Sequence, residues 1–201
     1  MKVGVMASGR GSNFQALIDA SLKGLMPDVE LTILIVNKKD AYAIKRAEEN
    51  NIEYKIVTSN DKTRKEFDQN VLKILREKKV EVVVLAGFMR LLTPEFIEEY
   101  RNNILNIHPS LLPLFPGAHA HRDAIINKAK VSGCTAHFVD EGIDTGPIIM
   151  QRLVKIEDGE TEDSLSEKIL PYEHEILPKT LQLLCSGKII LNGRDVEILC
   201  D

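Results

Sequence analysis

The sequence predicts an α/β fold, an open and mostly parallel twisted sheet with helices on both faces and antiparallel strands at its C-terminal side. Three observations support this prediction. Short apolar runs typical of buried parallel strands alternate with amphipathic helical segments through the N-terminal half. The first of these runs leads through a glycine-rich turn directly into a helix. Two later strands with alternating patterns are separated only by an acidic loop, as in a hairpin.

The composition is that of an ordinary globular protein, with 44% hydrophobic and 28% charged residues in a chain of 201. A net charge of −4 argues against a broad surface for nucleic acid or membranes. Cys134, Cys185 and Cys200 form no CxxC pair, which disfavours a disulfide framework or a zinc knuckle. No signal peptide follows Met1, and no apolar run reaches the ~20 residues of a membrane span. We expect one cytoplasmic domain over residues 1–201.

The first strand, at residues 2–7, leads into the loop 8–13 and then into a helix whose expected N-cap is Ser12 or Asn13. This arrangement presents free backbone N–H groups and the positive end of a helix dipole to an anion. Phe14 occupies the place of the third glycine of a dinucleotide fingerprint, and the lysine of a Walker loop is missing. A single phosphate or a phosphoribosyl group fits better, while a plain turn stays open as the alternative.

The next segments continue the alternation of strand and helix. We expect a strand at 31–36, a helix at 40–50, a strand at 53–57, a helix from an Asp61 cap to about Lys79 and a strand at 80–86. Arg64 lies on the first turn of the helix that is expected to begin after Asp61, and most arginines in such positions are solvated. The apolar loop 87–92 follows the last strand, at the carboxyl edge where open α/β sheets bind ligands. Thr93 and Pro94 then start a short helix.

The central stretch of the chain is a strand at 104–107 followed by the loop 109–117, whose prolines and glycine exclude a helix. Asn106 and His108 are two residues apart, so they project to the same face of an extended backbone. A carboxamide donor beside an imidazole is suited to stabilise a developing oxyanion. The pair needs a carboxylate to orient the imidazole, and Asp144 is the best candidate.

The C-terminal half continues with helices and antiparallel strands. We expect a helix at 118–128, paired strands at 134–139 and 148–154, a helix from 161 to about 184 that is interrupted or kinked near Pro171 and Pro178, and a β ribbon of 189–191 and 196–199. His119 and His121 could suggest a metal site together with His108 and Asp144. Two loop histidines without a metal are the better interpretation, because no second His or Cys cluster is spaced for ligation.

Five motifs in this order resemble the phosphoribosylglycinamide formyltransferases, a family of folate-dependent formyltransferases with a Rossmann-like fold. The resemblance covers about residues 3–180, and its Asn-x-His-Pro block with a downstream Asp is highly specific. The motifs are Ser8-Gly9-x-Gly11-Ser12-Asn13, Leu85-Ala86-Gly87-Phe88-Met89-Arg90, Asn106-Ile107-His108-Pro109-Ser110-Leu111-Leu112-Pro113, Gly133-Cys134-Thr135-x-His137-Phe138-Val139-Asp140 and Asp144-x-Gly146-Pro147-Ile148-Ile149-x-Gln151.

The resemblance implies direct transfer of the formyl group of 10-formyltetrahydrofolate, a co-substrate, to the amine of glycinamide ribonucleotide in purine biosynthesis, with no metal. Asn106 and a protonated His108 would stabilise the oxyanion. Asp144 would favour the protonated imidazole and assist proton transfer. The expected partners are these small molecules alone, without nucleic acid or membrane, for a monomer or a homodimer.

The resemblance also implies the ligand-binding residues. The substrate phosphate would lie on Gly11, Ser12 and Asn13, and Glu173 would hold the ribonucleotide. Leu170 replaces part of a more polar, glutamine-containing run, so the resemblance gives no firm ribose contact there. The folate would contact Arg64, Met89, Arg90, Leu91, Leu92, Asn106, Asp140, Glu141, Gly142 and Ile143.

Two rival functions stay open. A formyltetrahydrofolate hydrolase would use the same three catalytic side chains on water, but Pro109 stands where a second histidine is expected in hydrolases. A phosphate-binding protein with a dead site would leave the Asn106, His108 and Asp144 set unexplained. Within the single domain, we expect residues 1–100 to form a phosphate-binding half and residues 101–201 a folate-binding half.

Overall fold

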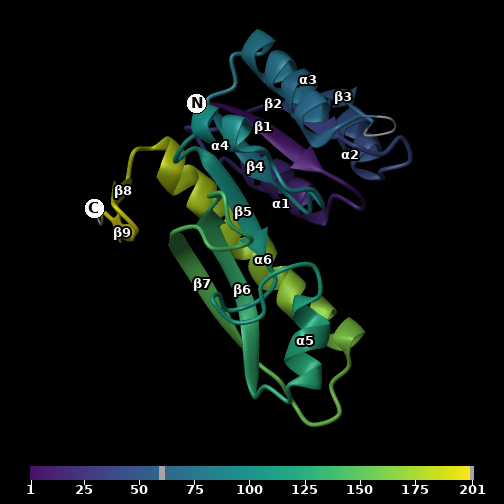
Figure 1. Ribbon diagram of the computed structural model, residues 1–201, viewed down its shortest axis with the longest axis vertical. Coiled ribbons are helices and arrows are strands. Elements are labelled where there is room, and N and C mark those ends of the chain that lie inside the picture. The colour runs from purple at the N-terminus through teal and green to yellow at the C-terminus, as the bar shows by residue number, and fades with distance from the viewer. Residues whose placement is uncertain (59–61, 200–201) are drawn as a thin grey trace.

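The computed structural model describes residues 1–58 and 62–199 and contains a seven-stranded sheet in the order β3-β2-β1-β4-β5-β6-β7 (Figure 1). The strands from β3 to β5 are parallel, and β6 and β7 are antiparallel, which confirms the predicted fold class. The strands are β1 (Lys2–Ala7), β2 (Glu30–Val36), β3 (Glu53–Ile56), β4 (Val82–Leu85), β5 (Ile104–His108), β6 (Val131–Phe138) and β7 (Ile148–Lys155).

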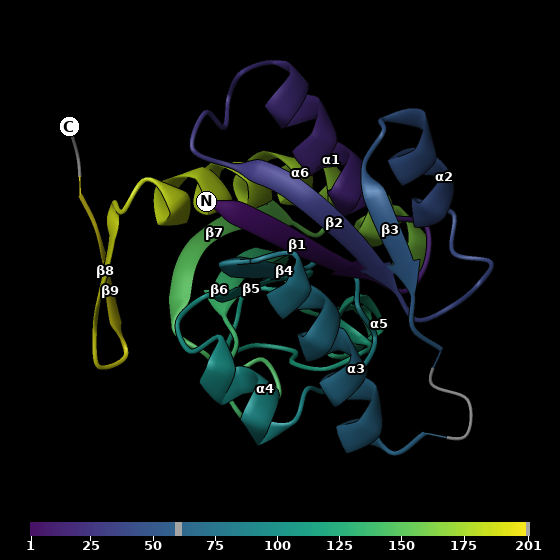
Figure 2. The same ribbon diagram turned by 90° about the horizontal axis from the view of Figure 1, so that it is seen from above.

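Helices cover both faces of the sheet, and each face has its own apolar core (Figure 2). The helices of one face are α1 (Ser12–Leu22), α2 (Ala43–Glu49), α5 (Ala120–Ile126) and α6 (Glu162–Cys185). The other face carries α3 (Arg64–Glu77) and α4 (Pro94–Glu99). In the described ranges, no helix is long and apolar enough to cross a membrane.

The start of α1 differs from the prediction, because Gly11 is its N-cap in place of Ser12 or Asn13. Gly11 has a φ of +66°, and a Cβ atom on it would lie 2.7 Å from the Cβ of Ala43. Only glycine combines this left-handed backbone with so close an approach to α2. Ser12 and Asn13 therefore lie inside the first turn of the helix, where the Asn13 side-chain amide donates to Glu173.

Other boundaries also shift. Helix α2 begins at Ala43, three residues later than expected from position 40. The predicted cap Asp61 lies outside the described residues, and α3 begins after Thr63, whose side chain and that of Glu66 form a capping box. The predicted interruption of the last long helix is wrong. Helix α6 runs unbroken through Pro171 and Pro178, because its buried apolar residues pack along the sheet on both sides of each proline.

The predicted β ribbon is confirmed at the C-terminal end, as β8 (Ile189–Asn192) and β9 (Asp195–Ile198).

On the side of the sheet that α3 and α4 cover, loops overlie the β5 end. Asn106 and His108 point to this side, because they alternate along the strand with Leu105 and Ile107, which belong to the core of the opposite face. The strand therefore presents two polar side chains to a space that is closed by loops.

Candidate active site

Asn106, His108 and Asp144 come together at the end of β5, as the sequence predicted. The carboxylate of Asp144 lies 3.3 Å from Nδ1 of His108 through Oδ2 and accepts from Nδ2 of Asn106 at 3.4 Å through Oδ1. The side chain of His108 is 6% exposed and that of Asp144 is 15% exposed. Charge-assisted contacts in such a dry setting are stronger than they would be at the surface.

Both ring nitrogens of His108 face oxygen atoms. Nε2 lies 2.9 Å from the carbonyl oxygen of Phe115, and Nδ1 faces the Asp144 carboxylate. An imidazolium would donate through both nitrogens, so the surroundings match the protonated ring. Because the Phe115 carbonyl holds Nε2, the nitrogen directed toward Asn106 and Asp144 is Nδ1.

Asp144 reaches the strand from a loop with an unusual backbone. Its φ is +52°, a left-handed conformation that aspartate tolerates better than most residues. Oδ2 also accepts a 2.7 Å hydrogen bond from the backbone N–H of Gly117, which ties the carboxylate to the end of the proline-rich loop. The three segments that carry His108, Gly117 and Asp144 are therefore joined at one carboxylate.

His137 is a member of this cluster to which the sequence analysis assigned no role. Its Nδ1 lies 2.7 Å from the carbonyl oxygen of Phe138, so Nδ1 carries the proton and Nε2 accepts from Nδ2 of Asn106 at 3.0 Å. Burial lowers the pKa of His137, which keeps the ring neutral. His137 thereby orients the Asn106 amide with its nitrogen toward Asp144. His137 lies opposite Asn106 in the pairing of β5 with β6, a register that the sequence does not show.

The proline-rich loop is anchored to the sheet by a buried network around Thr135. The Thr135 hydroxyl donates to the Ser110 carbonyl at 2.6 Å and accepts from the Leu112 N–H at 3.1 Å. The amide of Gln151 donates to the Leu112 carbonyl at 2.9 Å. These bonds hold the loop that supplies Phe115 and Gly117 to the catalytic cluster.

The predicted anion site lies at the N-terminus of α1. Gly11 has no side chain to cap the helix, so the first N–H groups of α1 point out of the helix end. Nδ2 of Asn13 donates to Oε2 of Glu173 on α6 at 2.7 Å, so the structure brings two separately predicted ligand residues together. Burial raises the pKa of Glu173, and the hydrogen bond from Asn13 offsets only part of this effect.

The predicted folate-binding loops expose apolar side chains beside the cluster. Met89 is 70% exposed, while Leu91 and Ile143 are each 53% exposed. Single exposed apolar residues are common, but three on the two loops beside one polar cluster suit the walls of an aromatic ligand site. The Met89 N–H donates to Oγ of Ser8 at 2.9 Å, which joins the predicted folate-binding loop 87–92 to the predicted phosphate-binding loop 8–13.

Arg90 and Leu92 belong to the predicted folate-binding loop 87–92, and their side chains pack against the protein. The Arg90 guanidinium stacks on the ring of Phe67 at 4.5 Å, and Leu92 is buried. The buried carboxylate of Asp68 accepts from the N–H of Thr93 at 2.6 Å and fixes the end of the loop. Arg64 is exposed on the first turn of α3.

The second predicted folate-binding segment, residues 140–143, borders a cavity of about 250 Å³. Asp140, Glu141 and Gly142 line one side of it, and Ile97 of α4 lines another.

His119 and His121 are not part of any metal site in the described ranges, where no group of three His, Cys, Asp or Glu side chains is placed to hold a metal ion. The structure therefore gives no support to the metal alternative.

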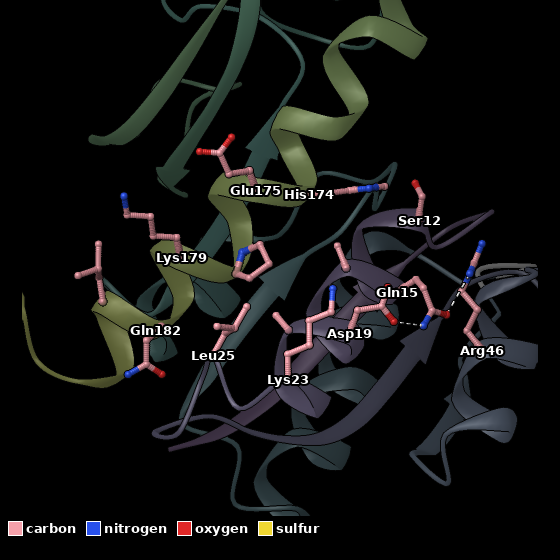
Figure 3. Close-up of a pocket in the computed structure, with 14 residues that line it drawn as sticks. Ser12, Gln15, Asp19, Lys23, Leu25, Arg46, His174, Glu175, Lys179 and Gln182 are labelled. Carbon is pink, nitrogen blue, oxygen red and sulfur yellow. Dashed lines mark hydrogen bonds between the residues drawn. The ribbon is translucent and has the colours of Figure 1, made fainter.

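A larger groove of about 640 Å³ runs between α1 and α6 (Figure 3). His174 and Pro178 line its α6 side, and Gln15 and Asp19 line its α1 side. Ser12 at one end is its single residue from the predicted site, so this groove is separate from the catalytic cluster.

The family model described as "Formyl transferase" matches residues 1–181 of the chain. A curated "Trifunctional purine biosynthetic protein adenosine-3" of Chironomus tentans is 44% identical over 96% of the chain, which spans 14% of that relative's length. The "Phosphoribosylglycinamide formyltransferase" of Bacillus subtilis is 39% identical over 91% of the chain and 94% of the relative. A crystal structure of "glycinamide ribonucleotide transformylase 1" from Symbiobacterium toebii has a TM-score of 0.96 and 39% identity, covering 100% of this chain and 94% of the other.

Proposed function

The chain belongs to the formyl transferase family, and from that premise we propose that it transfers the formyl group of 10-formyltetrahydrofolate directly to the amine of glycinamide ribonucleotide. The observation that carries the proposal is the convergence of Asn106, His108 and Asp144 on one point at the end of β5. Formyl transfer to an amine needs oxyanion donors and a proton acceptor within reach of the same carbon. This cluster contains both.

In the proposed reaction, the substrate amine attacks the formyl carbon and forms a C–N bond and an oxyanion. Nδ2 of Asn106 and Nδ1–H of a protonated His108 donate to this oxyanion. The attacking nitrogen loses one proton, with the Asp144 carboxylate as the acceptor, directly or through water. The bond from the formyl carbon to N10 of the folate then breaks, and N10 gains a proton. One proton leaves an amine and one reaches an amine, so the exchange balances.

The proposed ligand sites flank this cluster. The phosphate of the ribonucleotide lies on the N–H groups of Gly11, Ser12 and Asn13, and Glu173 holds its glycinamide end. The folate lies along the two apolar loops, with main-chain groups reading the edge of the pterin. Arg64 pairs with the carboxylate of the glutamate tail. In this arrangement the phosphate contacts come from the N-terminal half of the domain, and the folate contacts come from both halves.

The proposal extends to the setting of the reaction. The partners are the two small-molecule substrates, the protein acts as a monomer or a homodimer, and it works in the cytoplasm. Size-exclusion chromatography with light scattering measures the oligomeric state. The purine-biosynthetic names of the relatives support the metabolic role.

One assay tests the function against its rivals. Purified protein is mixed with 10-formyltetrahydrofolate, and release of tetrahydrofolate is followed with and without glycinamide ribonucleotide. Release only in the presence of the ribonucleotide is the expected result. Equal release in both mixtures would identify the hydrolase, and release in neither would identify a binding protein with a dead site. A parallel sample dialysed against EDTA is expected to keep full activity.

A further inference from the structure

The C-terminal ribbon contacts the loop that carries Asp144. The turn between β8 and β9 contains Arg194, and the ribbon lies on the β7 side of the sheet in both views (Figures 1 and 2). Leu191 and Val196 of the ribbon pack partly against the core, so its position is supported by burial. This packing brings the guanidinium of Arg194 to the loop 140–145.

Arg194 binds the loop at two points. Nη1 lies 3.3 Å from Oδ2 of Asp140, and Nη2 donates to the carbonyl oxygen of Thr145. The loop closes on itself between the same two residues, because the Thr145 hydroxyl donates to Oδ1 of Asp140 at 2.6 Å and the Gly142 N–H donates to the same oxygen at 3.2 Å. Burial alone would raise the pKa of Asp140, but these hydrogen bonds and Arg194 outweigh it and lower the pKa, so the carboxylate stays ionised.

The segment needs such support. Glu141, Gly142, Ile143 and Thr145 are all exposed, and Asp144 between them has its left-handed backbone. The Asp144 carboxylate is held by the Gly117 N–H, and the chain packs closely on the sheet at Gly146, where a Cβ would lie 1.7 Å from the carbonyl oxygen of Phe138. Before Gly146, Arg194 joins the two ends of the exposed segment to the rest of the molecule.

We propose that Arg194 is a positioning residue that holds the loop 140–145 and thereby keeps Asp144 against His108 and keeps Asp140 and Gly142 in the positions of the proposed folate contacts. This role rests on the proposed formyl transfer and deepens it, since it links a ribbon outside the family motifs to the folate site. Arg194 itself does not touch the reacting atoms.

The test compares Arg194→Ala and Arg194→Lys with Arg152→Ala. Arg152 is the matched control, because it forms an exposed pair with Glu175 at 2.7 Å and does not contact the loop. Loss of one exposed ion pair changes the equilibrium between the held and the released loop by about fivefold. We therefore expect Arg194→Ala to raise KM for 10-formyltetrahydrofolate by about that factor. We also expect it to lower kcat, because Asp144 is on the same loop. KM for glycinamide ribonucleotide is expected to stay unchanged, since its proposed site lies at α1. Lysine restores part of the effect, because it replaces the charge without the two-point contact.

Amide hydrogen exchange of residues 140–145 gives a second readout that does not depend on activity. Arg194→Ala is expected to speed exchange in this loop and nowhere in the core, with Tm unchanged. Unchanged loop exchange would overturn the proposal, and so would faster exchange with unchanged kinetics or an equal effect in Arg152→Ala. If the wild type transfers no formyl group to the ribonucleotide, the proposed function fails, and the exchange rates still decide whether Arg194 holds the loop.

Discussion

The predicted anion site at α1 and the proposed catalytic cluster at β5 are built in opposite ways. The anion site uses one continuous segment, in which β1, the turn at Gly11 and the first turn of α1 follow one another along the chain. The catalytic cluster joins side chains that are far apart, since Asn106 and His137 are separated by 31 positions and Asn106 and Asp144 by 38. The first site depends on backbone geometry and the second on long-range packing.

This difference teaches which kind of change each site tolerates. Backbone N–H groups do not depend on the side chains that carry them, so the anion site is sensitive mainly where the backbone itself is special. The catalytic cluster depends on the chemistry of each side chain and on the loops that deliver it. A substitution at the cluster should therefore alter kcat, and a substitution at the anion site should alter binding or stability.

The largest effect is expected at the catalytic cluster. His108→Ala and Asp144→Asn each remove a group that acts on the reacting atoms, so each should lower kcat by about 10³-fold or more. Binding of both substrates should survive, because the phosphate and pterin contacts are elsewhere. Steady-state kinetics and titration calorimetry measure the two effects, with Asp158→Asn on the surface as the control. Turnover close to the wild-type value in either variant would disprove the assigned roles.

Gly11→Ala addresses the backbone side of the comparison. The new Cβ would meet the Cβ of Ala43 at 2.7 Å in a left-handed conformation, which should cost about 1–3 kcal/mol of stability. The shifted turn should raise KM for glycinamide ribonucleotide about tenfold while KM for the folate stays unchanged, since two or three N–H contacts to the phosphate are disturbed. Gly9→Ala is the matched control, because no atom lies within 4 Å of its Cβ position. Equal stability of the two variants would refute the steric account.

The smallest effect concerns Glu173, a side chain of α6 that accepts a hydrogen bond from Asn13 at the predicted anion site. Its pKa is raised from the ordinary value of 4.5, so the folded state favours the neutral carboxyl and loses stability as pH rises above 4.5 toward the raised pKa. Glu173→Gln should remove this loss and stabilise the protein by about 1–2 kcal/mol at pH 7.5, with no gain at pH 4. Thermal unfolding between pH 4 and 8 measures the difference. A gain that does not depend on pH would show that the ionised carboxylate carries no such penalty.

Much of the molecule was predictable from local patterns. The apolar runs and the acidic hairpin loop predicted the sheet, and the glycine-rich turn predicted the passage from β1 into α1, because each depends on neighbours within a few positions. The same local view was wrong about an interruption at Pro171 or Pro178, where packing of α6 on the sheet overrides the cost of two prolines. It also placed the cap of α1 on Ser12 or Asn13, since it could not show that the backbone at Gly11 turns left-handed against Ala43 of α2.

The sequence by itself determined the fold class and singled out Asn106, His108 and Asp144 as the predicted catalytic set, because residue type and spacing limit what they can do. Only the tertiary structure decided how they are held. It placed neutral His137 against the Asn106 amide and directed Arg194 at the loop that carries Asp144. These contacts join positions tens of residues apart, so they follow from strand pairing and ribbon docking, and no local pattern records them.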